Sequence, residues 1–231
     1  MSNFSGPRKS EEARGFSRKA AALLLFLFLI PTILAIDSSL RSEYKTGETL
    51  IASFTGLTEL KTENILFYSG RAFTPLVYDL AKIQDRYYLY ALLPFEEKNL
   101  TLKLLQVKFI EQGQEVTRDL QYNFLVKGNI SAFSINPGFI ITNNDFKIKI
   151  QNYDKPTTLS TSFQGNTNQH SLIIGEEKTL TFSISKNSSL EFLTISGSDT
   201  SYSIPISVFK NQSLVQSKTK FFKFTKHSTS P

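Results

Sequence analysis

The side chains that most often perform catalysis are scarce in this sequence. There are two histidines, His170 and His227, and no cysteine. No serine lies in a Gly-x-Ser-x-Gly motif, the sharp turn that exposes the nucleophile of an α/β-hydrolase. Thiolate nucleophiles, iron–sulfur clusters and Cys-ligated zinc sites all require cysteine. The sequence therefore predicts a protein that is not an enzyme and holds no cofactor.

Acidic residues occur at positions where a glycosidase site or a calcium site can be considered. The pairs Glu96–Glu97 and Glu176–Glu177 are adjacent in sequence, so on strands their side chains point to opposite faces and cannot share a glycosidase cleft. Asp145 and Asp154 follow asparagines and would bring oxygen ligands toward Ca²⁺ at one end of a sheet. Asn and Asp also favour turns for local backbone reasons. We favour turns at both positions and predict no metal site.

Five tyrosines fall within a short stretch of the chain, and they allow two interpretations. They would form an aromatic platform for a glycan or a peptide, or they would pack across strands within a core. Aromatic pairs commonly stabilise sheets, and the sequence has no tryptophan, so we favour packing. The five residues are Tyr68, Tyr78, Tyr87, Tyr88 and Tyr90.

The positive charge of the chain lies at its two ends. The formal net charge is +6, but residues 1–19 contribute +3 and residues 210–231 contribute +5, from five lysines and no acid. Residues 20–209 therefore sum to −2. A mildly acidic body offers no electrostatic footprint for a phosphate backbone, which argues against nucleic-acid binding.

An uncharged apolar run, residues 20–36, follows the basic segment and ends abruptly at Asp37. A positive segment, an apolar run and a small residue at the cleavage point are typical of a secretory signal, and Ala35 would supply that residue. The alternative is an uncleaved membrane anchor with its basic end inside. Both interpretations place residues 37–231 outside the cytoplasm. An exported chain without cysteine forgoes disulfides, which favours a prokaryotic cell surface.

The body of the chain shows short alternating or apolar runs separated by Gly, Asn, Asp and Pro, and no helical periodicity. We predict an all-β protein with two sandwiches in tandem, residues 37–128 and 129–210. They follow residues 1–36, which comprise a cytoplasmic basic segment and the signal peptide or membrane anchor. A hairpin is expected around Gly113. Pro205 is expected at a sheet edge or against solvent, because proline cannot donate to a ladder. Residues 211–231 form a basic tail, predicted to be disordered or the start of a truncated domain.

Two short motifs resemble immunoglobulin-like (Ig-like) modules of prokaryotic extracellular proteins. The segment EYKTGETLIASF, residues 43–54, is similar to their amino-terminal entry, in which a Gly-Glu turn precedes the first long strand. The segment IIGEEKTLTFSI, residues 173–184, is similar to a Gly-Glu turn in their later half. The resemblance implies an adhesive, spacer or assembly role, and it transfers no catalytic residue.

The sequence also offers sites for glycosylation and leaves more than one function open. Glycosylation sequons suited to an exported body occur at Asn99, Asn129, Asn187 and Asn211. We expect a non-catalytic cell-surface module that binds a protein or glycan ligand, and that contacts the membrane through its amino-terminal segment if this is uncleaved. One alternative is a periplasmic assembly chaperone that offers Leu120–Val126 as an exposed edge. The other is a glycan-binding or hydrolase accessory module.

Overall fold

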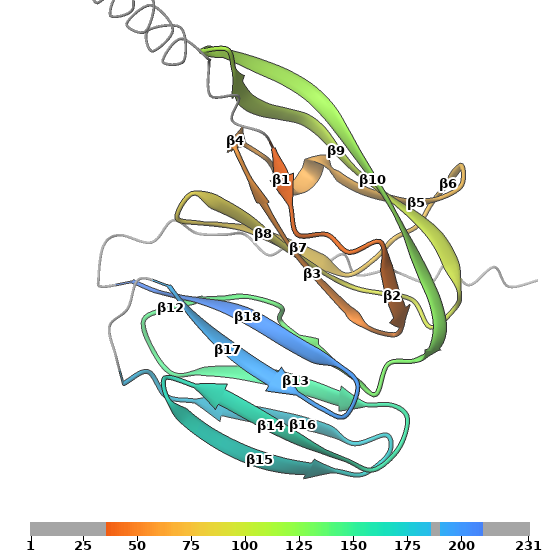
Figure 1. Cartoon of the computed structure of the whole chain (residues 1–231), viewed down its shortest axis with the longest axis vertical. Coiled ribbons are helices and arrows are strands. Elements are labelled where there is room, and N and C mark those ends of the chain that lie inside the picture. The colour runs from red at the N-terminus through yellow and green to blue at the C-terminus, as the bar shows by residue number, and fades with distance from the viewer. Residues whose placement is uncertain (1–35, 186–189, 210–231) are drawn as a thin grey trace, which may run out of the picture.

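The computed structural model describes residues 36–185 and 190–209 (Figure 1). Apart from a single 3-10 turn at Thr62–Asn64, these residues form β-strands and loops. The predicted all-β fold is confirmed. Within the described residues, no helix is long and apolar enough to cross a membrane; nearly all of the apolar run proposed as a signal or anchor lies outside them.

Two sheets form the first sandwich. One has the order β1-β3-β8-β7, formed by Asp37–Ser38, Thr49–Thr55, Arg86–Leu92 and Tyr78–Ile83. The other has the order β2-β10-β9-β5-β6, formed by Glu43–Thr46, Gln114–Ile130, Lys98–Glu111, Ile65–Ser69 and Ala72–Phe73. The short strand β4, Leu57–Glu59, pairs with β9. The predicted hairpin is confirmed, because β9 and β10 are joined at Gly113, whose φ is +80°.

The second sandwich is smaller and has the same plan. Its three-stranded sheet has the order β11-β13-β16, formed by Phe133–Asn136, Phe146–Asn152 and Glu177–Phe182. Its five-stranded sheet has the order β12-β18-β17-β14-β15, formed by Ile140–Thr142, Ser201–Val208, Glu191–Ser196, Thr157–Phe163 and Asn166–Leu172.

The strand order identifies both sandwiches as Ig-like. In that fold the strands A, B, E and D form one sheet and C, F and G form the other. The first sandwich has this order when β1, β3, β8 and β7 are taken as A, B, E and D, and β5, β9 and β10 as C, F and G. The second repeats it without D. In both, the first strand divides between the sheets, and its second part pairs in parallel with the last strand.

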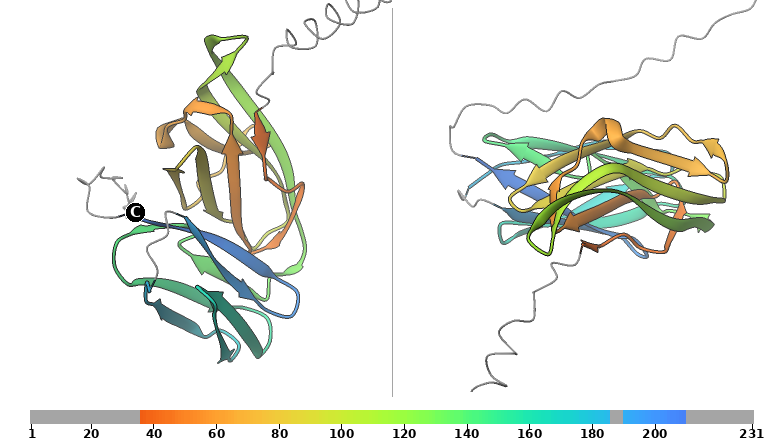
Figure 2. Two further views of the ribbon diagram at one scale, coloured as in Figure 1. Left: turned by 60° about the vertical axis from the view of Figure 1, so that its left-hand side comes forward. Right: turned by 90° about the horizontal axis from the view of Figure 1, so that it is seen from above.

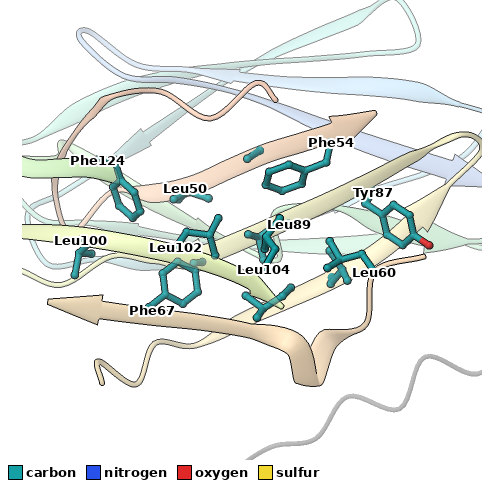
Figure 3. Packing of buried hydrophobic residues seen from close by; sticks show 14 of the residues in the cluster. Leu50, Phe54, Leu60, Phe67, Tyr87, Leu89, Leu100, Leu102, Leu104 and Phe124 are labelled. Atoms are coloured by element: carbon teal, nitrogen blue, oxygen red, sulfur yellow. The ribbon is translucent and has the colours of Figure 1, made fainter. Parts of the chain in front are cut away.

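Alternation along the strands explains how each core forms. In β13, Phe146, Ile148 and Ile150 are buried while Lys147 and Lys149 are exposed. The core of the first sandwich is built in the same way from both of its sheets, as the labelled side chains in Figure 3 show. Burying each such aliphatic side chain contributes about 1.5–3 kcal/mol, so ordinary sheet packing supplies the stability that disulfides would otherwise add.

Both Gly-Glu motifs form the same local turn. Gly47 and Gly175 adopt positive φ values of 69° and 74°, which glycine tolerates because it lacks a Cβ atom. The carboxylate of Glu48 then accepts the backbone N–H of Lys45 at 2.8 Å. In the second motif, Glu176 accepts the N–H of Ile173 at 2.8 Å. Each glutamate therefore closes its turn onto the residue three positions earlier.

The structure corrects the expectation for Pro205. This residue is buried, and its strand β18 lies between β12 and β17 rather than at an edge. The missing N–H is accommodated because β12 begins to pair with β18 only at Ile206. The β12 side of the ladder therefore requires no hydrogen bond from Pro205.

Candidate functional site

The two sandwiches meet along the outer face of the β3, β8 and β7 sheet. In β8, Tyr87 and Leu89 point into the core of the first sandwich, and Tyr88 and Tyr90 point out of it. The outward tyrosines are nevertheless buried, because they pack with residues of the second sandwich. Both faces of β8 are therefore covered. The cluster at this joint comprises Ile51, Ala81, Ile83, Tyr88, Tyr90, Phe139 and Leu190.

The side chain of Thr49 joins the first sandwich to the edge of the second. Its hydroxyl donates to the carbonyl oxygen of Ile135 at 2.8 Å and accepts the N–H of Ile135 at 3.0 Å. Ile135 lies in β11, the edge strand of the three-stranded sheet. Thr49 thus satisfies backbone groups of Ile135 as a neighbouring strand would. Both residues are about 1% exposed, so neither backbone group can turn to water instead.

Tyr202 of β18 continues this network into the second core. Its phenol oxygen accepts the backbone N–H of Thr49 at 3.1 Å and donates to the carbonyl of Phe133 at 3.0 Å. Its ring packs edge-on against that of Phe133, with centroids 5.2 Å apart. Burial raises the pKa of Tyr202 well above its usual value, because the phenolate would be desolvated. The hydroxyl therefore stays protonated and able to donate.

A close backbone approach at Gly138 seats Tyr90 in the joint. A Cβ atom built on Gly138 would lie 2.4 Å from the Cβ of Tyr90, so only glycine fits. The Tyr90 ring packs edge-on against Phe139 with centroids 5.4 Å apart, and its hydroxyl donates to Asn136 Oδ1 at 3.2 Å. Burial raises the pKa of Tyr90 to about 12. The joint is thus specified sterically as well as by hydrogen bonds.

Polar and aromatic contacts line the rim of the joint. Lys45 Nζ lies 2.6 Å from a carboxylate oxygen of Asp199, and the hydrogen bond from Lys45 lowers the pKa of Asp199. Phe95 and Tyr153 pack edge-on with centroids 4.8 Å apart. A hollow of about 430 Å³ lies beside the Lys45–Asp199 pair and is lined by groups of both charge signs. Mixed charge without a convergent set of ligands suits a structural rim rather than a binding pocket.

The segment between the sandwiches is short and buried. Strand β10 ends at Ile130 and β11 begins at Phe133. The two residues between them, Ser131 and Ala132, are 0% and 1% exposed, and the N–H of Ser131 donates to the carbonyl of Thr46 at 2.8 Å. A buried, hydrogen-bonded link of this kind favours one rigid body over two domains on a flexible tether.

The acidic residues singled out in the sequence serve separate local contacts. Glu97 accepts the N–H of Gly128 at 2.8 Å, and Glu177 pairs with Lys149 at 3.0 Å. Asp145 and Asp154 flank β13, which has seven residues and so spans about 23 Å. The interpretation that they converge at one end of the sandwich is therefore wrong. Within the described residues, no group of three or more metal-ligating side chains is brought together.

The tyrosines of the first sandwich do not form a platform. Tyr87 belongs to its core, and Tyr88 and Tyr90 belong to the joint. Tyr78 packs on Phe67 and donates to the carbonyl of Ile65 at 2.9 Å. Tyr68 pairs with Phe73, and Lys103 Nζ lies 4.9 Å from its ring centroid. These contacts agree with packing, the interpretation favoured from the sequence.

The predicted modification sites are only partly within the described residues. Asn99 is exposed at the start of β9, and Asn129 is exposed near the end of β10, beside the hollow at the joint. Asn187, Asn211, His227 and Ala35 lie outside the described residues. His170 lies in β15, where Nε2 is 3.2 Å from the hydroxyl of Thr161. Burial lowers the pKa of His170, and the ring acts as a local hydrogen-bond partner.

Comparisons with known proteins return structural likeness alone. No family model matches the sequence, and no curated protein matches it. The I9–I11 tandem of titin is similar, at 7% identity and a TM-score of 0.26 over 75% of this chain, which spans 65% of that structure. The polymeric Ig receptor ectodomain of a teleost fish shares 8% sequence identity at a TM-score of 0.31. The match covers 78% of this chain and 100% of that structure. The fibronectin(III)-like modules of CbhA from Clostridium thermocellum share 14% sequence identity with this chain at a TM-score of 0.24. The match covers 75% of this chain and 93% of that structure.

Proposed function

We propose that this chain is a non-catalytic module that works outside the cytoplasm, at a prokaryotic cell surface, by presenting binding surfaces on two rigidly joined sandwiches. The observation that carries the proposal is the buried joint, in which Thr49, Tyr202 and Ile135 share hydrogen bonds across the two bodies. A rigid joint fixes the relative position of loops and sheet faces, and this lowers the entropic cost when both bodies engage one target.

The proposed location rests on the sequence. The apolar run that ends at Ile36 follows a basic segment, the order found in signals and amino-terminal anchors. Because the chain has no cysteine, an oxidising compartment neither helps nor harms its folding. We propose that the segment delivers the module across the membrane, either cleaved after Ala35 or retained as an anchor.

The chaperone alternative finds less support in the geometry. Strand β2 pairs with β10 only from Leu125 onward, so the unpaired part of this edge lies toward the tip of the β9–β10 hairpin. Figures 1 and 2 show that this tip points away from the second sandwich. An edge that grips a subunit would instead be expected to face the groove between the bodies.

Labelling of single cysteines tests the proposed location, because the natural chain has no thiol background. Gln121→Cys and Thr181→Cys place one thiol on an exposed position of each sandwich. We expect a membrane-impermeant maleimide to modify both in intact cells, or in cells whose outer layer alone is opened. Modification that requires lysis of the inner membrane would contradict the proposal, and a cytosolic single-cysteine protein serves as the control.

A further inference from the structure

The outer face of the five-stranded sheet differs from the other sheet faces in its chemistry. The buried side chains of β14, β17 and β18 include Leu159, Leu193 and Ile204. The positions between them point outward, and in the described part of these strands and of β15 none is charged. They are Thr158, Ser160, Ser162, Thr167, Gln169, Ser171, Phe192, Thr194, Ser196, Ser201, Ser203 and Ser207, together with Pro205, which is buried.

Strand register arranges these hydroxyl and amide groups in rows. One row crosses four strands through Gln169, Ser160, Ser196 and Ser201. The next row along the strands runs through Thr167, Ser162, Thr194 and Ser203. Neighbouring strands lie about 4.8 Å apart, and the rows are about 6.6 Å apart. The face therefore presents a regular array of groups that both donate and accept hydrogen bonds.

The same chain shows what an ordinary outer face looks like. In the corresponding sheet of the first sandwich, Lys127 pairs with Glu43 at 2.9 Å, and Lys103 lies over the ring of Tyr68. On the opposite sheet of the second sandwich, Lys149 pairs with Glu177 at 3.0 Å. Soluble surfaces normally intersperse charges of both signs, so the hydroxyl face departs from the pattern that both other faces follow.

We propose that this hydroxyl face, the outward side of β14, β15, β17 and β18, docks an uncharged polysaccharide. An anionic or cationic partner would find no complementary charge at the outward positions of these strands, since Glu191 of β17 pairs with Ile206 and is not one of them. A protein partner is disfavoured, because interface cores are enriched in Tyr, Trp, Phe, Met and Arg and depleted in Ser. Of those five residue types, the outward positions of these strands carry only Phe192, among many serines and threonines. Hydroxyls of a neutral sugar match the array as donors and acceptors. The identification rests on the proposed surface function.

Two features place the ligand more closely on the face. A shallow hollow of about 420 Å³ lies at one corner, lined by Thr158, Ser160, Gln169 and Ser196, with Lys155 from the preceding loop. Small-molecule sites commonly have volumes of about 300–1,000 Å³, so the hollow would take part of a glycan chain. On the same face, Phe192 is 48% exposed and offers an apolar ring to the C–H face of a sugar. The polysaccharide chain would run from the hollow across the rows of hydroxyl groups.

Affinity electrophoresis tests the proposal with polysaccharides of known charge. Gels containing amylose, mannan, galactan or hydroxyethylcellulose are compared with gels containing alginate or heparin. We expect the protein to be retarded by at least one neutral polymer and not by the anionic ones. Thr158→Glu should weaken that binding about tenfold, because a carboxylate in the hollow must be desolvated. The matched control Thr181→Glu, on the exposed outer face of the opposite sheet, should bind as the natural chain does.

Three results would overturn the proposal. In the first, no neutral polymer retards the protein. In the second, alginate retards it as strongly as the neutral polymers do. In the third, Thr158→Glu and Thr181→Glu bind equally well. A concentration-dependent dimer that Thr158→Glu dissolves would assign the face to a second copy instead. If Thr158→Glu fails to fold, Gln169→Ser replaces it in the test, and its affinity for the neutral polymer is expected to fall several-fold. Maleimide labelling of Gln121→Cys and Thr181→Cys in cells is scored separately, so failure here leaves the proposed location untouched.

Discussion

The backbone N–H of Thr49 in the first sandwich donates a hydrogen bond of 3.1 Å to the phenol oxygen of Tyr202 in the second. The two residues are 153 positions apart in the chain, and each is at most 4% exposed. Buried polar groups are costly when unpaired, so this contact and its neighbours resist separation of the two bodies. The joint therefore behaves as part of the folded core.

Replacing Thr49 with valine should destabilise the protein by about 2 kcal/mol. Valine keeps the shape of threonine but removes the hydroxyl that serves both backbone groups of Ile135. Urea unfolding of Thr49→Val and of the control Thr101→Val measures the difference. The control lies on an outer face, where Thr101 bonds to Asn123, and should change stability by less than about 0.5 kcal/mol. Equal losses would show that the joint carries no special stability.

Stability should fall at alkaline pH because of the buried tyrosines of the joint. Burial raises the folded-state pKa of Tyr202, and that of Tyr90 to about 12, above the unfolded value of about 10. The folded state therefore retains protons that the unfolded state loses. The stabilisation is complete below pH about 10, and it declines above that by up to about 1.4 kcal/mol per pH unit for each tyrosine.

Urea unfolding at a series of alkaline pH values checks this dependence. Tyr202→Phe should be less stable at neutral pH, because Thr49 and Phe133 each lose a partner, and its stability should fall less steeply above pH about 10. A variant whose alkaline decline has the same slope as that of the natural chain would contradict the role given to Tyr202.

A methyl group at Gly138 should push the sandwiches apart. The added Cβ would lie 2.4 Å from the Cβ of Tyr90 and 3.2 Å from Ile51, both parts of the joint. We expect Gly138→Ala to expose tyrosine rings and to increase proteolysis near residues 131–132. Gly113→Ala is the control, since nothing lies within 4 Å of its Cβ and only the backbone conformation opposes it. Unchanged protease resistance in Gly138→Ala would argue against a tight joint.

The fold was predictable from the sequence because it depends on local signals. Alternation in segments such as Phe146–Ile150 predicts a strand and its buried face. The Gly-Glu turns at Gly47 and Gly175 are equally local, since each needs a positive φ and a glutamate that reaches back three residues. Such features involve only neighbouring residues, and the structure has them where the sequence predicts them.

The joint could not be predicted in the same way. Thr49 and Ile135 are separated by 86 residues, and nothing in either local sequence identifies the other as its partner. One signal was present, namely that β8 is apolar on both faces, which requires a second covering layer for Tyr88 and Tyr90. The wrong prediction for Pro205, which was expected at a sheet edge or against solvent, has a related cause. The residue at which β12 starts to pair with β18 depends on tertiary packing.

Amino-terminal sequencing of protein from cell fractions should find a mature chain that begins at Ile36. That start follows from cleavage after Ala35, the small residue at the end of the apolar run. An intact Met1 in the membrane fraction would show that the segment is retained as an anchor. Full-length protein in the cytosol would contradict export in either form.

Pulsed electron spin resonance on the doubly labelled variant Gln121→Cys, Thr181→Cys tests the rigid joint most directly. These exposed positions lie in β10 of the first sandwich and β16 of the second. We predict one narrow distribution of distances between the two nitroxides, which broadens when Thr49→Val or Gly138→Ala is added. A broad distribution in the otherwise natural chain would contradict the account, because it would mean that the two sandwiches move independently.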